Sequence, residues 1–569
     1  MEILPKFSDI QTIAATQQYQ VVPLSCEILS DIRTPIEALR ILKTHSSHCF
    51  LLESVADKER WGRYTFLGFE PTLEVTCSDG QMQIGDKVIK FARPDTPAAV
   101  SAAVANPAAS STAAVAPKAV APAAPKAGAH AGTVAETTVS ADTAVPAGAA
   151  AANACSSRVS VASLGKQPAH PNEVLRKLLA KYRSPRLPYL PTFTGGLVGY
   201  FSYDYLGYSE PSVRVKVDDQ DHFKDVDLML FDKVIAFDNF RQKIILIVNI
   251  RLSQVPSELR QEYENGCAEL VRLGELLRYG QAKPEPQGKL LSAFQPLFDE
   301  QAYCDMVRRG QHYIHEGDIF QIVLSNRLSA DFSGSLLDTY RILRTVNPSP
   351  YMFYFGGTDV EVAGASPETL VKLEDGVLYT FPLAGTRPRG KTPEEDQALE
   401  TELLADEKEI AEHNMLVDLG RNDLGKISEF GSVVVEKFHS IERYSHVMHI
   451  GSTVRGIIRP EYDAFDAINA VLPAGTLSGA PKIRACQLIG ELEQNKRGIY
   501  GGAVGYIDFT GNMDTCIAIR LAYQKNGKVF VRSGAGVVAD SVPATEYREC
   551  INKAQAVISA LKIASQEDL

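Results

Sequence analysis

The sequence predicts an α+β fold built from antiparallel hairpins and separate long helices. The stretch KVIAFDNFRQKIILIVNIRL, residues 233–252, has two β-rich runs around a polar turn. A second pair of runs, in residues 369–383, surrounds an Asp-Gly turn at 375–376. Farther along, TPEE at 392–395 combines a capping box with proline at the first helical position, which predicts a helix start. Hairpins and independent helices favour α+β over repeated βαβ units.

One segment interrupts the folded pattern. Residues 94–170 are rich in Ala, Pro, Ser and Thr and hold almost no large apolar side chains, which predicts a disordered insertion. We interpret it as a spacer rather than a docking segment. Folded patterning resumes at NEVLRKLLAKYR, residues 172–183, where apolar residues recur at helical spacing. The predicted organisation is an N-terminal region, 1–93 and 171–290, followed by a second region, 291–569.

Composition limits the function classes. The 569-residue chain is 45% hydrophobic, enough for a large core. Its 58 basic and 69 acidic residues give a net charge of -11, which excludes nucleic-acid coating as the main function. No apolar run approaches the roughly 18 residues of a membrane span, and no secretory signal is evident. Nine scattered cysteines without a CxxC motif predict free thiols, so we expect a soluble cytoplasmic protein without nucleic-acid or membrane partners.

A first acidic cluster lies in LLADEKEIAEHNMLVDLGRNDLGKIS, residues 403–428. Glu409, Glu412 and His413 are three and four residues apart, so the spacing predicts that they share one side of a helix. For a single stripe of this kind, an ordinary solvated face with surface salt bridges is the favoured explanation.

A second cluster of the same kind weakens that alternative. Glu546, Glu549 and Lys553 are spaced at i, i+3 and i+7 in a predicted helix near the C-terminus. Two carboxylate stripes on separate helices can share Mg²⁺, which takes a few protein carboxylates and keeps positions for water and an anionic substrate. The preceding Gly534-Ala535-Gly536 is predicted to be a turn whose exposed amides seat an anion.

Five long motifs, in this order, are similar to those of the chorismate-utilising enzymes, and among these to the anthranilate synthase large subunits. They are FPLAGTRPRG (381–390), EIAEHNMLVDLGRNDLGKIS (409–428), GTLSGAPKIRA (475–485), YGGAVGYIDFTGNMDTCIAIR (500–520) and SGAGVVADSVPATEYRE (533–549). The resemblance covers nearly the whole chain except the insertion. It implies an α/β sandwich of two large antiparallel sheets flanked by helices around a central cleft, which binds chorismate and Mg²⁺.

The resemblance also assigns residues to roles. Glu412 and Glu549 match the Mg²⁺ ligands. Glu409 and Glu546 match residues that support these ligands or serve as alternative ligands. The catalytic set is Glu368, expected to protonate the departing ring hydroxyl, His449, linked to the loss of pyruvate, and Thr476. By spacing alone, His446 is as good a candidate as His449. The substrate-binding set is Gly385, Thr386, Tyr500, Arg520, Gly534, Ala535, Gly536 and Lys553. For Arg387 and Arg389, substrate contact and bracing of the loop remain open alternatives.

Two substitutions within the motifs indicate the nucleophile. Similar aminodeoxychorismate synthases carry a nucleophilic lysine at the position of Ala384, and isochorismate and salicylate synthases a water-activating lysine at that of Gln321. Neither residue present here can serve, so the resemblance implies attack by external ammonia. The expected product is anthranilate, with release of pyruvate, in the first committed step of tryptophan biosynthesis. Aminodeoxychorismate synthase, or a non-catalytic amino-acid sensor, remains the alternative.

The expected partners follow from the proposed use of external ammonia and from the family resemblance. No cysteine has the setting of a glutaminase nucleophile, so we expect a hetero-oligomer in which a separate glutamine amidotransferase subunit supplies ammonia. The N-terminal region resembles the family's regulatory, tryptophan-binding part, and 291–569 its chorismate-binding catalytic domain. The tryptophan set is Glu53, Ser54, Pro350, Tyr351 and Met352, although spacing alone predicts only a strand end and a Pro-rich turn.

Overall fold

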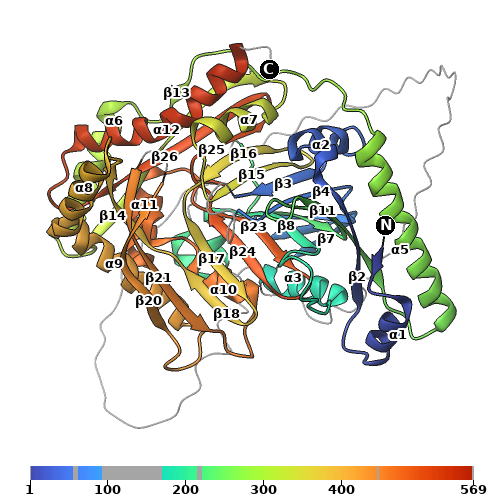
Figure 1. Ribbon diagram of the computed structural model, residues 1–569. Helices are drawn as coiled ribbons and strands as arrows, with labels where there is room; N and C mark the ends of the chain where they lie inside the picture. The colour runs from blue at the N-terminus through green and yellow to red at the C-terminus, as the bar shows by residue number, and fades with distance from the viewer. Residues whose placement is uncertain (1, 55–61, 92–169, 215–220, 445–446, 567–569) are drawn as a thin grey trace, which may run out of the picture. The chain divides into compact units, whose positions relative to one another are not determined.

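A computed structural model describes residues 2–54, 62–91, 170–214, 221–444 and 447–566 of the chain (Figure 1). The described residues belong to one compact unit, formed by Met1–Arg93 and Gln167–Leu569. Apart from His170, the predicted insertion at 94–170 lies outside the described residues, as does His446.

The first of two sheets in the described chain has 14 strands. Its order is β1 (Ile3–Leu4), β2 (Val21–Leu29), β11 (Lys243–Arg251), β10 (Lys233–Asp238), β4 (Tyr64–Phe69), β3 (Cys49–Glu53), β15 (Tyr351–Gly356), β16 (Glu361–Ser366), β25 (Leu521–Lys525), β26 (Lys528–Val537), β14 (Gln321–Ser333) and β12 (Lys289–Leu290), while β13 (Gln295–Pro296) and β22 (Gly479–Ala480) also pair with β14.

The second sheet has 12 strands in the described chain. Its order is β19 (Leu383–Pro388), β21 (Val447–Ile457), β18 (Val377–Thr380), β17 (Thr369–Glu374), β24 (Met513–Ile517), β23 (Ala503–Asp508), β8 (Gly196–Phe201), β9 (Val226–Phe231), β5 (Leu73–Ser78), β6 (Gln81–Ile84) and β7 (Lys87–Lys90), with β20 (Val434–Arg443) paired to β21. The neighbouring strands are antiparallel in both sheets, for example β14 with β26 and β17 with β24.

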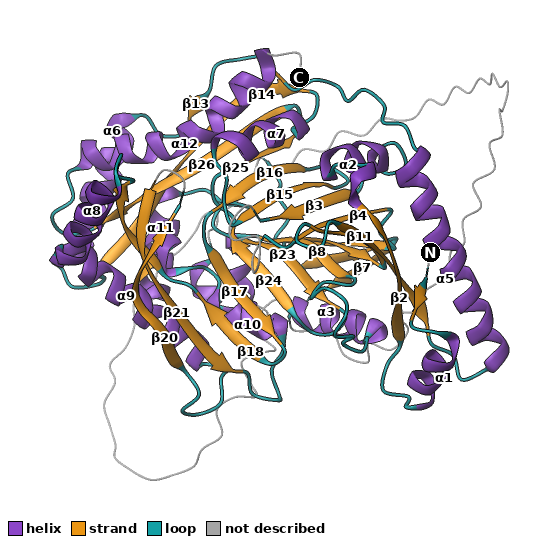
Figure 2. Ribbon diagram, in the orientation of Figure 1, coloured by secondary structure: helices purple, strands orange, loops and turns teal. Residues whose placement is uncertain are grey.

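Helices flank the two sheets (Figure 2). They are α1 (Phe7–Ala15), α2 (Pro35–Lys43), α3 (Pro171–Leu179), α4 (Leu206–Ser209), α5 (Pro256–Tyr279), α6 (Glu300–His315), α7 (Leu337–Val346), α8 (Pro393–Ala405), α9 (Glu407–Gly425), α10 (Ala464–Val471), α11 (Lys482–Glu493) and α12 (Pro543–Gln566). Helices α2, α5, α7 and α12 pack on the first sheet, and α3, α9 and α10 on the second.

The two predicted hairpins and the predicted helix start at Thr392 are confirmed. Strands β10 and β11 form one hairpin, and β17 and β18 form the other. The second hairpin turns at Asp375 and Gly376, whose φ angles are +50° and +83°. Helix α8 begins as predicted, because the Thr392 side chain accepts a hydrogen bond from the Glu395 backbone amide.

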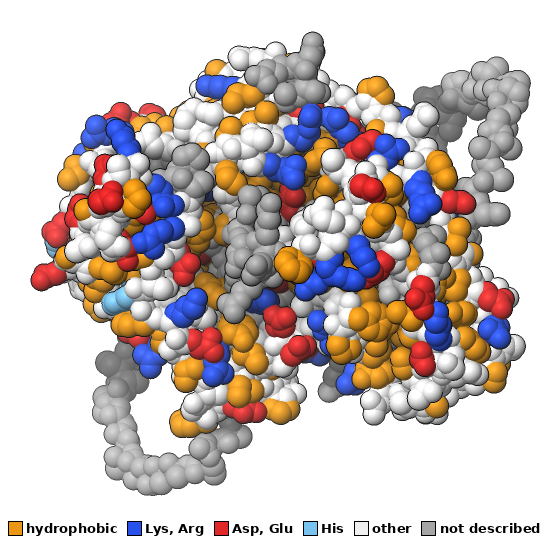
Figure 3. All heavy atoms as spheres, viewed as in Figure 1, with side chains coloured by type: hydrophobic (Ala, Val, Ile, Leu, Met, Phe, Trp, Pro, Cys, Tyr) orange, Lys and Arg blue, Asp and Glu red, His pale blue; other side chains and the backbone are white. Residues whose placement is uncertain are grey.

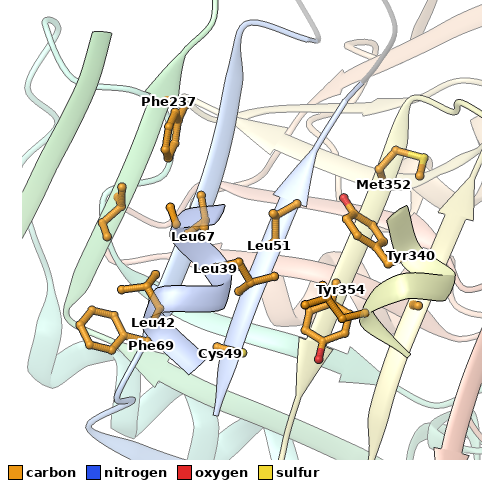
Figure 4. Packing of buried hydrophobic residues seen from close by; sticks show 14 of the residues in the cluster. Leu39, Leu42, Cys49, Leu51, Leu67, Phe69, Phe237, Tyr340, Met352 and Tyr354 are labelled. Atoms are coloured by element: carbon orange, nitrogen blue, oxygen red, sulfur yellow. The ribbon is translucent and has the colours of Figure 1, made fainter. Parts of the chain in front are cut away.

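Apolar side chains hold the layers together. One cluster joins the first sheet to its helices, where Tyr340 of α7 packs beside Tyr354 and Met352 of β15 (Figure 4). Another cluster draws on both sheets, for example Phe50 of β3, Phe231 of β9 and Tyr523 of β25, and so fills the space between them. Burial of this kind stabilises a fold by roughly 25 cal/mol per Å² of apolar surface.

The predicted fold class is confirmed, with two antiparallel sheets flanked by helices. Both sheets take strands from both predicted regions, so the division at residue 290 stays a prediction about roles. Acidic and basic side chains are interspersed on the face shown in Figure 3. Within the described residues, no helix combines the length and the apolar character that a membrane crossing requires.

Candidate functional site

The predicted acid, Glu368, lies in the short connection between β16 and β17. Thr476, in the 3₁₀ turn Gly475–Leu477, donates a hydrogen bond from Oγ1 to Glu368 Oε1 at 3.1 Å. Burial raises the pKa of Glu368 to about 7, against the opposing effects of the Thr476 hydroxyl and the positive charges of Arg520 and Lys553. A carboxyl group with this pKa is partly protonated at neutral pH, as a general acid must be.

Arg520 follows β24 and has an uncommon positive φ of +52°. Its partly buried guanidinium makes no hydrogen bond or ion pair with the described residues. Burial lowers its pKa, and the charge of Glu368 opposes this effect. A guanidinium without a protein partner is a planar donor set suited to a carboxylate.

A β-bulge at Gly385 brings Thr386 and His449 together. The register of β19 against β21 shifts between Ala384 and Thr386, and Gly385 has φ +69°. The His449 Nδ1 atom lies 2.9 Å from the Gly385 carbonyl oxygen and 3.1 Å from Thr386 Oγ1. Because the carbonyl only accepts, we assign the proton to Nδ1.

This tautomer gives His449 a defined chemical capacity. Burial lowers its pKa, with a further contribution from the positive charge of Arg520, so the imidazole is neutral at pH 7. Its Nε2 atom then carries a lone pair that can accept a proton. His449 is therefore arranged as a base within the same site as Glu368.

The contacts of the two arginines of this segment show that both brace the loop, and their contact with substrate stays a prediction. Arg387 donates to Glu402 at 3.0 Å and to Asp406 at 2.9 Å. Arg389 donates to Asp396 through two nitrogens, at 2.8 and 3.0 Å. Both guanidinium groups thus bond to α8, and that of Arg387 also bonds to Asp406, which caps α9. These bonds brace β19.

The predicted metal ligands come from α9 and α12. Burial and the nearby charge of Glu409 raise the pKa of Glu412, and Glu549 adds to this effect across the two helices. The Glu549 carboxylate forms an ion pair of 2.7 Å with Lys553. The chemistry of this donor set fits Mg²⁺, because negative charge gathers at oxygen ligands around the site.

The protein groups alone do not form a complete metal site. Among the described residues, no three His, Cys, Asp or Glu side chains are grouped closely enough to hold an ion. Mg²⁺ ordinarily keeps several non-protein oxygens, so a site with one or two carboxylates remains compatible with it. The structure brings Glu412 and Glu549 into one electrostatic neighbourhood, and their ligand role stays a prediction.

His413 does not belong to the acidic face, so the predicted stripe is wrong at this position. Its side chain is fully buried, and its Nε2 atom lies 2.6 Å from the Ser452 hydroxyl. Burial lowers the pKa of His413 to about 4. The residue after Glu412 points to another side of the helix, and the apolar packing of α9 against β21 determines which side is buried.

The predicted turn at Gly534-Ala535-Gly536 is also wrong, because these residues lie within β26 and pair with β14. Their place beside other predicted residues is clear. A Cβ atom at Gly534 would lie 3.0 Å from the Tyr500 hydroxyl, and one at Gly536 would lie 2.9 Å from Gln321 Nε2. At Gly534 and Gly536 the strand therefore has no side chains, and we call this part of β26 the β26 wall.

Behind this wall lies a buried ionic cluster that sequence reasoning missed. The Glu493 carboxylate pairs with Arg497 at 2.6 Å and with Arg532 at 2.7 Å. Both guanidinium groups lie about 6 Å from the Tyr500 ring, at 6.0 and 5.9 Å. Arg497 also donates to the Leu477 carbonyl at 2.6 Å. The i, i+4 spacing of Glu493 and Arg497 was the one available signal.

The predicted tryptophan-binding residues line a separate cavity of about 690 Å³. All five, Glu53, Ser54, Pro350, Tyr351 and Met352, contribute to its wall. Arg344 of α7 donates a hydrogen bond of 3.0 Å to Glu53 Oε2 and so holds the Glu53 carboxylate. The structure thus brings the predicted set together, and its ligand stays a prediction.

Six further charged side chains line the same cavity and were not predicted: Arg63, Arg186, Arg241 and three on two paired strands. Lys372 and Glu374 come from β17, and Asp514 comes from β24. They alternate with inward-facing core residues, and a single strand sequence gives no signal that distinguishes a cavity wall from a solvated face.

A family described as chorismate binding enzyme matches residues 136–559. The chain belongs to this family. It is 37% identical over 577 residues to anthranilate synthase component 1 of Acetivibrio thermocellus, with 99% of each chain covered. It is 40% identical over 559 residues to that of Pseudomonas aeruginosa, covering 97% of this chain and 98% of the relative.

Solved structures agree on the fold. Anthranilate synthase component I of Streptococcus pneumoniae matches with a TM-score of 0.66 and 33% identity, over 93% of this chain and 98% of that one. The menaquinone-specific isochorismate synthase of Escherichia coli matches with a TM-score of 0.60 and 16% identity over 98% of each chain, a likeness of fold alone. The predicted family and fold are therefore confirmed.

Proposed function

We propose that this protein is the large subunit of an anthranilate synthase, a lyase that converts chorismate and ammonia to anthranilate and pyruvate. One observation carries the proposal: the partly protonated acid Glu368 lies beside Arg520, whose side chain has no partner among the described residues. This pair suits acid-assisted loss of a hydroxyl from a carboxylate-bearing substrate. The relatives named anthranilate synthase component 1 support it.

The first half-reaction adds ammonia to the ring and expels water. Arg520 binds a carboxylate and fixes the orientation of the ring. Glu368 gives its proton to the departing hydroxyl, which leaves as water, and the incoming amine then returns a proton to the Glu368 carboxylate. Ala384 and Gln321 offer no amine to the ring, which supports ammonia as the nucleophile.

The second half-reaction eliminates pyruvate and makes the ring aromatic. The neutral His449, with its proton on Nδ1, has Nε2 available to take a proton from the ring. The hydrogen bond to the Gly385 carbonyl holds the imidazole in this tautomer and stabilises the imidazolium that forms.

Mg²⁺ is the proposed cofactor. Glu412 and Glu549 would hold it, and when bound it would neutralise substrate carboxylate charge and stabilise charge that develops on the ring. Lys553, paired with Glu549, lies 3.4 Å from the Gly534 carbonyl and so links the acidic residues to the β26 wall.

Ammonia is proposed to come from glutamine through a separate glutamine amidotransferase subunit. A thiol nucleophile needs a lowered pKa. Burial instead raises the pKa of each described cysteine, namely Cys26, Cys49, Cys77, Cys267, Cys304, Cys486, Cys516 and Cys550. Free thiols of this kind suit a reducing compartment, so we assign the enzyme to the cytoplasm.

Regulation is proposed to act through the cavity of about 690 Å³. Tryptophan, the pathway's end product, would bind there and favour a less active state, so that binding and activity are coupled. The regions 1–93 and 171–290 would form the regulatory part, while β15, β17, β23 and β24 of the region 291–569 supply the rest of the cavity wall.

The deciding experiment is incubation with chorismate, Mg²⁺ and ammonium, followed by identification of the product. Fluorescent anthranilate together with pyruvate is expected. Aminodeoxychorismate would indicate the alternative synthase. A protein that binds tryptophan but does not convert chorismate would be a sensor. Glutamine should replace ammonium only after the amidotransferase subunit is added.

A further inference from the structure

The large cavity and the catalytic carboxyl are separated by one pair of strands. Asp514 and Cys516 of β24 line the large cavity, whereas the next residue, Ile517, lines a small cavity that also contains Glu368. On the neighbouring strand β17, Lys372 lies on the large cavity. The paired antiparallel strands β17 and β24 thus separate the two cavities.

A hydroxyl pair connects the two cavities. The Tyr351 hydroxyl lies 2.8 Å from Thr369 Oγ1 and 2.9 Å from Asp514 Oδ1. Tyr351 lines the large cavity, while Thr369 lines the small one. Because an ionised carboxylate only accepts, Tyr351 donates to Asp514 and accepts the hydrogen of Thr369.

The position of Thr369 bears directly on Glu368, the preceding residue. The pairing of β17 with β24 shifts between Thr369 and Val371, so the regular ladder is interrupted next to the acid. From β24, the backbone of Glu368 receives one hydrogen bond, from the Ile517 amide to the Glu368 carbonyl at 3.0 Å. The Ser366 hydroxyl makes two longer contacts of 3.4 Å, with the Glu368 amide and with its carbonyl oxygen. A side-chain bond at Thr369 therefore adds a constraint where the ladder supplies few.

We propose that Tyr351 is a positioning residue for Glu368 and acts through Thr369. The bond between the two hydroxyls fixes the start of β17, which directs the Glu368 carboxyl toward Thr476 and Arg520. A ligand in the large cavity that displaces the Tyr351 ring breaks or strains this bond and moves the acid. The inference rests on the proposed function, to which it adds the route from the regulatory cavity to the acid.

The route explains why occupation of one site lowers activity at the other without direct contact. Coupling requires an element with two arrangements whose balance both sites affect. Here that element is the short segment from Glu368 to Thr369, held by Tyr351 on one side and by Thr476 on the other. By reciprocity, a substrate that favours the positioned acid weakens binding in the large cavity.

Tyr351→Phe and Thr369→Val test the route, because each removes one hydroxyl and keeps most of the side-chain volume. We expect kcat to fall about tenfold, part of the roughly 10²–10⁴-fold contribution of a positioned general acid. The ionisable groups around Glu368 are Arg520, Lys553 and Tyr444. If the acid moves away from Thr476 and Arg520, its pKa rises, and the alkaline limb of the kcat profile moves to higher pH.

The same variants should bind tryptophan in equilibrium dialysis yet respond to it less, with inhibition at saturation reduced at least threefold. The double variant should lose no more than Tyr351→Phe, because that substitution already removes the bond to Thr369 together with the bond to Asp514. Thr369→Ser, which restores a hydroxyl, should recover the wild-type pH profile.

Tyr354→Phe is the matched control. Tyr354 lies on the same strand but on the other face of the sheet, where it packs beside Tyr340 and bonds to Lys43 at 2.6 Å (Figure 4). Its loss should leave the pH profile and the inhibition unchanged even if the melting temperature falls. An unchanged pH profile in Tyr351→Phe overturns the positioning role. Wild-type enzyme that makes anthranilate but ignores tryptophan overturns the proposed regulation instead, and the pH profiles still decide the positioning.

Discussion

Thr476 Oγ1 donates a hydrogen bond of 3.1 Å to Glu368 Oε1. A bond to the ionised carboxylate favours that form, so it lowers the pKa of Glu368, whereas burial raises it. The balance places the pKa at about 7. The acid is thus protonated often enough to donate at neutral pH, yet it can lose its proton within each cycle.

Thr476→Val tests this balance. The variant removes the donor, so the pKa of Glu368 should rise by roughly one unit, given about 1.5–3 kcal/mol for a hydrogen bond to a charged group. The active form is protonated, and turnover is therefore lost as pH rises through the pKa. We expect the alkaline limb of kcat against pH to move upward, and a downward shift would contradict the assignment.

Glu368→Gln separates catalysis from stability. Removal of the acid should lower kcat at least about 100-fold. The pKa of Glu368 is about 7 in the folded protein and 4.5 as the ordinary value, so its contribution to stability is present below pH 4.5 and is lost as pH rises through 7.

The difference in melting temperature between Glu368→Gln and the wild type should consequently become more favourable to the variant from pH 5 to pH 8. Thermal denaturation followed by circular dichroism at each pH provides the measurement. A variant that is inactive and also progressively less stable above pH 7 would indicate a structural role for this carboxyl.

The metal site is tested by Glu412→Gln and Glu549→Gln. Each change replaces a charged oxygen ligand by a neutral one, so each should remove most activity and weaken Mg²⁺ binding measured by calorimetry. Glu407→Gln is the control, because Glu407 is exposed in the first turn of α9. Wild-type turnover with an unchanged Mg²⁺ requirement in both ligand variants would sink the shared-metal proposal.

Ser54→Phe tests the regulatory cavity. Ser54 lines the cavity of about 690 Å³ at the end of β3, and a phenyl ring there would occupy space that a ligand needs. The tryptophan concentration for half-inhibition should rise at least about tenfold, equivalent to roughly 1.4 kcal/mol. Ser54→Ala leaves the space open and should remain inhibited. Equal dose responses for the two variants would place the inhibitor elsewhere.

Local structure was largely predictable because it depends on neighbours in the sequence. The Asp375-Gly376 turn and the Thr392 cap follow from backbone geometry and nearby hydrogen bonds. The pairing of β3 with β15, whose partners Leu52 and Phe353 are about 300 residues apart, leaves no local signal. Only the resemblance to the family anticipated two large sheets.

The candidate site shows the same division. Spacing placed Glu409 and Glu412 near each other, but it also placed His413 with them, because a helical period does not say which side faces the core. Two glycines in three residues suggested a turn at Gly534–Gly536. Pairing with β14 overrode that local preference, since an internal strand satisfies the backbone amides.

Ala384 provides the final prediction. It lies in β19 immediately before the bulge at Gly385 and pairs with Ile450, the residue after His449. Ala384→Lys should therefore place an amine beside the reacting ring and obstruct ammonia, lowering anthranilate formation. An efficient aminodeoxychorismate synthase is not expected, because a nucleophilic amine needs a lowered pKa and supporting groups that one substitution does not provide.

Ala384→Met distinguishes obstruction from amine chemistry, since it adds similar length without a nucleophile. Both variants should lose activity, and only the lysine variant should gain mass after incubation with chorismate. That gain corresponds to a new C–N bond to the ring, with the ring hydroxyl leaving as water. Should Ala384→Lys make anthranilate from ammonium at the wild-type rate, position 384 does not face the ring. The distinction between the two synthases would then have to rest on the nature of the product alone.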